Sequence, residues 1–202
     1  MEGIAPADDA GANYRLHKVY RMGTITTRFE YIAGGLNQCG YWRDDWQFRH
    51  MDGKGNQMRD IDKIFVHCSA TRPTWWAGKS AQEQTAEIKR WHTDERGWSD
   101  IGYHFVVGRD GTVVEGRSVE RTPAAQRGHN KGSIAICVLG GHGGASDDDF
   151  FDNFTKPQDE ALRGLIEDLC DEYDIDDEDV FGHNEVSTKA CPCFDVQRWL
   201  NG

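Results

Sequence analysis

The run Ser133-Ile-Ala-Ile-Cys-Val-Leu139 is the most continuously apolar stretch of the 202-residue chain. Apolar residues at consecutive positions, without polar alternation, are typical of a strand that is covered on both faces. We therefore predict that this stretch is the central strand of a sheet. A shorter apolar run, Ile64-Phe-Val66, leads into His67 and predicts a second buried strand.

Two capping boxes predict helices on either side of the central strand. Ser80-Ala-Gln-Glu83 begins a helix that runs to about His92, and Thr155-Lys-Pro-Gln158 begins a second helix with proline in its first turn. Apolar residues follow the second box at helical spacing: Leu162, Leu165, Ile166, Leu169, Cys170 and Tyr173.

The remaining signals complete an alternation of strands and helices. Strands are predicted at 103–107 and 112–115, joined through Gly108-Arg-Asp-Gly111, whose Asp-Gly pair suits a hairpin. Residues 180–183 form a short strand or turn, and 194–200 form a closing helical turn. This order predicts an α/β fold, a mixed central β-sheet flanked by helices.

A small β-rich N-terminal extension precedes this pattern. Two strand-like segments, 17–22 and 24–32, lie on either side of Gly23. We divide the chain into an extension over 1–58 and a main domain over 59–202.

Charge and hydropathy exclude several classes of protein. The net charge is -11, and the segment 147–179 holds 15 of the 34 acidic residues with only two basic ones. A nucleic-acid-binding protein needs clustered basic residues, so we expect no nucleic-acid partner. No window approaches the roughly 20 consecutive apolar residues of a membrane span, and the first residues lack the apolar core of a signal peptide.

Histidine and cysteine side chains suggest a metal site. We expect the six cysteines to be reduced thiols, because they are widely spread in a chain without a secretion signal. His67 ends a buried strand, His183 follows a short one, and Cys191 comes eight residues later, so all three could meet at one sheet edge. Three such ligands and an open fourth position are typical of catalytic zinc. Taken alone, a histidine at a strand end is more often a structural residue, and a single cysteine is more often part of the core.

Four ordered blocks resemble a known family, the phage lysozymes that are zinc N-acetylmuramoyl-L-alanine amidases of the type 2 amidase and peptidoglycan-recognition-protein superfamily. The resemblance covers about residues 59–202. The blocks are Phe65-Val-His-Cys-Ser-Ala-Thr71, Gly102-Tyr-His-Phe-Val-Val-Gly-Arg-Asp-Gly-Thr-Val-Val-Glu-Gly-Arg117, Asn130-Lys-Gly-Ser-Ile-Ala-Ile-Cys-Val-Leu-Gly-Gly141 and His183-Asn-Glu-Val-Ser-Thr-Lys-Ala-Cys-Pro-Cys-Phe-Asp195.

The resemblance implies a site. It makes His67, His183 and Cys191 ligands of Zn²⁺, and it makes Tyr103 and Lys189 catalytic residues. Lys189 would stabilise the oxyanion, and Tyr103, at the start of its strand, would orient water or relay a proton. The alternatives are a surface lysine and a tyrosine at the core edge.

The chain departs from the family pattern at two positions. Cys193 stands where a serine is familiar, and Gln126 stands where a histidine is usual, in the loop Ala124-Ala-Gln-Arg-Gly-His129. We expect the second departure to affect contacts of this loop with substrate.

Other candidate residues have two interpretations each. His104 lies on the sheet face opposite Tyr103 and is expected to be structural. Glu185 either supports a ligand or is a solvated carboxylate. Three tryptophans either stack on sugar rings or pack internally: Trp75, Trp76 and Trp98. Five histidines are expected at the surface: His17, His50, His92, His129 and His142.

The resemblance implies a phage endolysin that hydrolyses the amide bond between N-acetylmuramic acid and L-alanine in bacterial peptidoglycan. The alternative is a non-catalytic peptidoglycan-binding or polymerase-regulating protein on the same fold, because phage relatives also bind the phage RNA polymerase. We expect a monomer that stays in the host cytoplasm until the membrane is breached and then acts on the wall in the periplasm. The extension over 1–58 either binds the wall or stabilises the enzyme.

Overall fold

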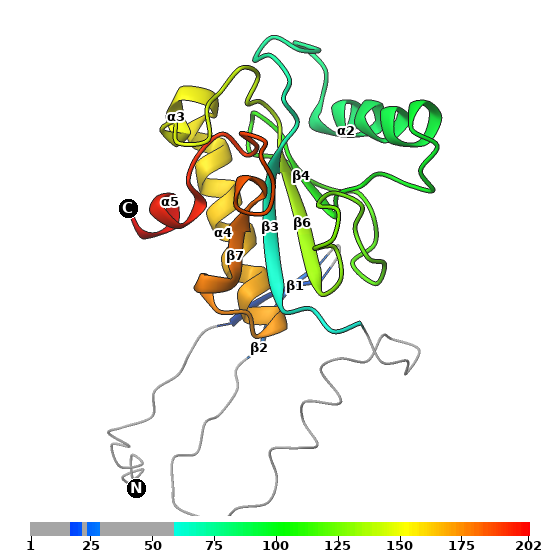
Figure 1. Ribbon diagram of the computed structural model, residues 1–202. Coiled ribbons are helices and arrows are strands. Elements are labelled where there is room, and N and C mark those ends of the chain that lie inside the picture. Colours follow the sequence, from blue (N-terminus) through cyan, green and yellow to red (C-terminus); the bar gives the residue numbers. More distant parts are fainter. Residues whose placement is uncertain (1–16, 22–23, 29–58) are drawn as a thin grey trace, which may run out of the picture. The chain divides into compact units, whose positions relative to one another are not determined.

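The computed structural model describes residues 17–21, 24–28 and 59–202. A five-stranded sheet carries the main domain, in the order β5-β4-β6-β3-β7 (Figure 1). The strands are β3 (Lys63–Cys68), β4 (Phe105–Val107), β5 (Val113–Glu115), β6 (Ser133–Val138) and β7 (Val180–Gly182). Only the edge strand β5 is antiparallel to its neighbour. Every residue of β6 is buried, which confirms the predicted central strand.

Helices cover the two faces of this sheet, as predicted. The regular helices are α2 (Ala81–Arg90), α3 (Phe150–Asn153), α4 (Lys156–Tyr173) and α5 (Val196–Asn201). Both predicted capping boxes form, at Ser80 and at Thr155. Figure 1 shows α2 and α4 on opposite sides of the sheet. The short helix α3 was not predicted.

The two faces have separate apolar clusters. Leu162 and Ile166 of α4 pack against Val66, Ile134 and other residues of one face. On the other face, Ile88 of α2 packs against Val106, Cys137 and Leu139. Side chains alternate along a strand, so His67, paired with Cys137 in the β3–β6 ladder, projects toward the face of α2.

Two boundaries differ from the predictions. The first helix continues beyond Arg90 as a π-helical turn, η1 (Trp91–Glu95). Tyr103 does not begin a strand, because the ladder of β4 starts at Phe105. The Ala135 N–H donates to the ring nitrogen Nδ1 of His104. In a regular ladder it would donate to a main-chain carbonyl of the neighbouring strand, so the ladder does not extend to Tyr103. Two 3₁₀ turns border β7, η2 (Asp177–Asp179) and η3 (His183–Glu185).

The N-terminal extension contains a two-stranded antiparallel hairpin, β1 (His17–Arg21) with β2 (Thr24–Arg28). This agrees with the two strands predicted there, although residues 22, 23 and 29–32 of that prediction lie outside the described residues. Among the residues that the structure describes, no helix is both long enough and apolar enough to cross a membrane.

Candidate metal centre and active site

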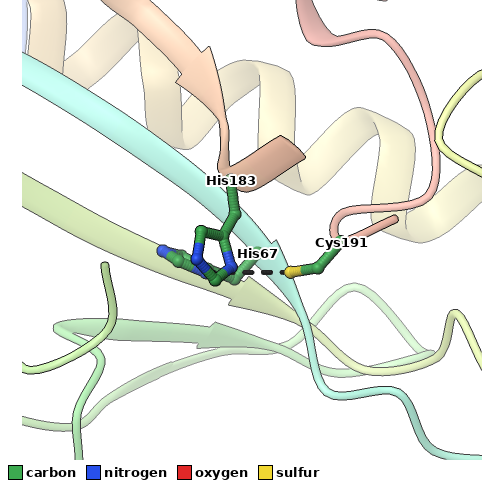
Figure 2. A group of neighbouring side chains, drawn as sticks. All are labelled: His67, His183 and Cys191. Atoms are coloured by element: carbon green, nitrogen blue, oxygen red, sulfur yellow. Dashed lines mark hydrogen bonds between the residues drawn. The ribbon is translucent and has the colours of Figure 1, made fainter. Parts of the chain in front are cut away.

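Three metal-ligating side chains meet at the C-terminal edge of the sheet. His67 lies near the end of β3, His183 directly follows β7, and Cys191 lies in the loop before α5. Because β3 and β7 are neighbouring parallel strands, their ends bring the two histidines together. The donor atoms of all three residues lie within 4.8 Å of one another. Figure 2 shows the three side chains converging from these separate segments.

Within this group, Cys191 Sγ lies 3.7 Å from His67 Nδ1. The ring centroids of His67 and His183 are 4.6 Å apart. The main-chain N–H of Cys68 donates to Cys191 Sγ over 3.2 Å. The structure therefore brings together the three residues that the sequence analysis selected as ligands.

Local electrostatics favour the metal-binding forms of these side chains. Burial, together with the nearby His183, lowers the pKa of His67 to about 3. Burial and the charge of Lys189 lower the pKa of His183. Hydrogen bonds from Cys68 lower the pKa of the Cys191 thiol, against the opposing effect of burial. Neutral imidazoles and a thiolate are the forms that bind metal.

The two predicted catalytic residues lie beside this group. The Tyr103 ring is centred 5.4 Å from the His67 ring, and burial raises the pKa of its hydroxyl. Lys189 is exposed, two residues before Cys191, and its positive charge contributes to the lowered pKa values of both histidines. Both residues therefore lie close enough to interact with the group of three candidate ligands.

His104 is structural, as predicted. Its side chain is 1% exposed, Nδ1 accepts from Ala135 N–H at 3.0 Å, and Nε2 lies 2.9 Å from the Arg121 carbonyl. Main-chain groups therefore occupy both ring nitrogens.

The surface prediction is wrong for His92, which is buried. Its ring stacks on Trp98 at 4.7 Å, and its Nδ1 accepts from Gly102 N–H. The π-helical turn at the end of α2 carries this ring inward. His129 and His142 are exposed, as predicted. His17 and His50 lie outside the residues whose side chains are described.

The sequence analysis expected Gln126 to affect contacts of its loop with substrate, but the structure places it against a candidate metal ligand. Its side chain is completely buried, and its Oε1 lies 3.0 Å from His67 Nε2. Its Nε2 donates to Ser133 Oγ at 2.6 Å. No spacing or motif signals this contact, because it depends on the path of the loop beneath His67.

The other candidates have supporting or packing roles. The exposed carboxylate of Glu185 accepts from Gly182 N–H, so it caps the turn that carries His183. Trp75 packs on the core beside α2, and Trp98 packs on His92. Trp76 stacks on Trp75 and remains 39% exposed.

The cysteines of the described region are free thiols, as predicted; they are Cys68, Cys137, Cys170, Cys191 and Cys193. Cys39 lies outside the described residues. Cys193 is buried, with its Sγ 3.7 Å from Cys68 Sγ and 3.3 Å from the Gly141 carbonyl.

Comparison with known proteins places this architecture in a family. The family described as N-acetylmuramoyl-L-alanine amidase matches residues 57–194. The endolysin of Escherichia phage T7 is 42% identical over 144 residues, which cover 71% of this chain and 87% of the endolysin. Peptidoglycan-recognition protein SC2 of Drosophila melanogaster is 34% identical over 165 residues, covering 79% of this chain and 85% of that protein.

A solved structure has the same fold. The N-acetylmuramoyl-L-alanine amidase LysC from Clostridium intestinale aligns with a TM-score of 0.54 and 25% identity, covering 70% of this chain and 83% of that one. The family match over residues 57–194 contains all three candidate ligands. The chain belongs to the N-acetylmuramoyl-L-alanine amidase family.

Proposed function

We propose that this chain is a phage endolysin that uses zinc to hydrolyse the amide bond between N-acetylmuramic acid and L-alanine in peptidoglycan. One observation carries the proposal: the donor atoms of His67, His183 and Cys191 converge within 4.8 Å, in a chain that is 42% identical to the T7 endolysin over 144 residues. A non-catalytic wall-binding protein would not need this set of donors.

The donor set fits zinc. Two imidazoles and one thiolate suit Zn²⁺, which is a borderline-soft ion, and three protein ligands leave a fourth position for water or substrate. Bound there, zinc would polarise the substrate carbonyl and lower the pKa of water toward neutrality. His67, His183 and Cys191 would hold it.

Two side chains would act on the reacting amide. The Lys189 ammonium is exposed beside the histidine pair, where it would donate a hydrogen bond to the carbonyl oxygen as negative charge develops. The hydroxyl of Tyr103, a half-buried residue, would orient the attacking water or pass a proton to the leaving amine. Its raised pKa keeps it protonated and therefore able to donate.

Release of new L-alanine amino termini from purified peptidoglycan tests the proposal. The protein is assayed as isolated, after chelation, and after zinc is restored. We expect amines to appear, to vanish with chelator and to return with zinc. A zinc-containing protein that sediments with sacculi but releases no amine would instead be a binding protein.

The extension over 1–58 is proposed as a separate module that binds the wall, and the alternative is that it stabilises the amidase. Deletion of 1–58 followed by sacculus pull-down and thermal melting distinguishes them. Undiminished pull-down with a lower melting temperature would leave only the stabilising role.

The cellular proposals follow from the endolysin assignment. The protein would accumulate in the host cytoplasm and reach the wall after membrane breach. A monomeric state and binding to the phage RNA polymerase remain predictions, and sedimentation with and without purified polymerase tests both.

A further inference from the structure

Gln126 connects a candidate metal ligand to Ser133, the first residue of the central strand. Its Oε1 lies 3.0 Å from His67 Nε2, and its Nε2 donates to Ser133 Oγ at 2.6 Å. The Ser133 hydroxyl then donates to the Asn130 carbonyl at 2.9 Å. Ser133 is the first residue of the fully buried strand β6, so the Gln126 side chain is anchored to the start of a buried strand.

The chemistry of these groups fixes the direction of every bond. The Asn130 carbonyl can only accept, so the single hydroxyl proton of Ser133 is committed to it. Ser133 Oγ must then accept from the Gln126 amide nitrogen, and the amide oxygen is left facing His67. An amide oxygen can only accept, so His67 Nε2 carries the ring proton.

The other ring nitrogen of His67 is consequently unprotonated and directed at the cluster. Nδ1 is the atom that lies 3.7 Å from Cys191 Sγ. Only an unprotonated nitrogen can bind a metal ion. The bond to Gln126 thus selects the tautomer in which the nitrogen beside Cys191 has a free lone pair.

The loop that carries Gln126 is itself held in place. The Asn130 side chain accepts from the main-chain N–H groups of Ala125 and Gln126, at 3.1 and 3.0 Å. The Gln126 side chain is 0% exposed, so water does not compete for its bonds. Burying this amide is favourable only because both of its ends are bonded.

We infer that Gln126 is a positioning residue, which holds His67 as the Nε2–H tautomer and presents Nδ1 to the metal. This inference rests on the metal site of the proposed function. Outer hydrogen bonds of this kind commonly change metal affinity by about 10- to 100-fold when removed.

The test compares zinc dissociation constants, measured by competition with a chelator, for full-length wild type and three variants. Gln126→Met keeps the volume and removes both bonds, and zinc should bind about 10- to 100-fold more weakly. Gln126→Glu restores an acceptor for Nε2–H, and zinc affinity should recover toward the wild-type value.

The matched control is Gln158→Met. Gln158 is also 0% exposed and donates to the Val107 and Leu139 carbonyls, but from α4 on the other face of the sheet. The Gln158→Met substitution should lower the melting temperature of the metal-free protein and leave the zinc dissociation constant unchanged. Equal zinc affinity in folded Gln126→Met and wild type would overturn the inference.

Nitrogen-15 NMR of the wild-type histidine rings gives a readout that needs no folded variant. We expect His67 to carry its proton on Nε2 without zinc and to bind zinc through Nδ1. A proton on Nδ1, or zinc on Nε2, contradicts the inference. A wild-type protein that binds no zinc contradicts the proposed function instead, so the two failures are distinguishable.

Discussion

His67 and His104 are two buried histidines for which we propose opposite roles, as a metal ligand and as a structural residue. Each side chain is 1% exposed, and burial lowers the pKa of each ring, to about 3 for His67 and about 4 for His104. Their partners differ. Main-chain groups occupy both nitrogens of His104, whereas His67 uses Nε2 for Gln126 and turns Nδ1 toward Cys191.

The comparison shows which property marks a ligand. Burial and a lowered pKa are common to both rings and therefore identify neither as a metal site. The distinguishing feature is a ring nitrogen that faces other donors while its partner nitrogen is held by a hydrogen bond. This feature depends on three-dimensional contacts of each ring.

Replacing each histidine by glutamine tests this distinction and should give the largest effect. His67→Gln removes a ligand, so zinc binding should be lost and amide hydrolysis should fall at least about 1,000-fold, because the metal supplies several kcal/mol of transition-state stabilisation. His104→Gln should keep zinc binding and hydrolysis. Zinc content, amine release and melting temperature are measured for both. Zinc loss in His104→Gln alone would reverse the assignment.

Lys189→Ala separates chemistry from metal binding at the same cluster. Removing one oxyanion donor typically lowers kcat by about 100- to 1,000-fold. We expect a loss in this range with zinc content and melting temperature unchanged, because Lys189 is exposed. Lys156→Ala, at an exposed lysine of α4, is the control and should retain full activity. Full activity of Lys189→Ala would make this residue an ordinary surface lysine.

The sequence predicted that the three candidate ligands lie together, but it did not predict that Gln126 contacts His67. His67 and His183 end short apolar segments, and parallel strands bring such ends to one edge, so pattern and topology suffice. The contact of Gln126 depends on how Asn130 shapes a loop without periodicity. His92 was misplaced for a similar reason, since the π-helical turn redirects its ring in a way that regular helical spacing does not predict.

The lowered pKa of His104 predicts how the stability of the protein depends on pH. Its folded pKa of about 4 lies below the ordinary 6.5 of an unfolded chain. Between these values the unfolded state binds the extra proton, so this group destabilises the fold as pH falls from 6.5 to 4, by up to about 3 kcal/mol.

His104→Gln removes this titration. The unfolding free energy of the metal-free variant should therefore fall less steeply than that of wild type over this pH range, as measured by urea denaturation with chelator present. His142→Gln, at an exposed histidine, should follow the wild-type curve. Parallel curves for wild type and His104→Gln would show that the ring titrates normally in the folded protein.

Cys191 and Cys193 also differ as a candidate ligand and a structural residue. Substitution of Cys193 is expected to have the smallest effect. Hydrogen bonds from Cys68 lower the pKa of Cys191. In contrast, the hydrogen bond between Cys193 and Cys68, together with burial, raises the pKa of Cys193. The thiolate form is therefore favoured at Cys191, and we expect this thiol, rather than Cys193, to bind the metal. Cys193→Ser keeps a donor for the Gly141 carbonyl, so it should change stability by no more than about 1 kcal/mol and leave zinc affinity intact. Cys191→Ser should lose zinc under the same conditions. If Cys193→Ser loses zinc and Cys191→Ser keeps it, the two thiols have exchanged roles, and a lowered pKa fails to distinguish ligand from structural cysteine.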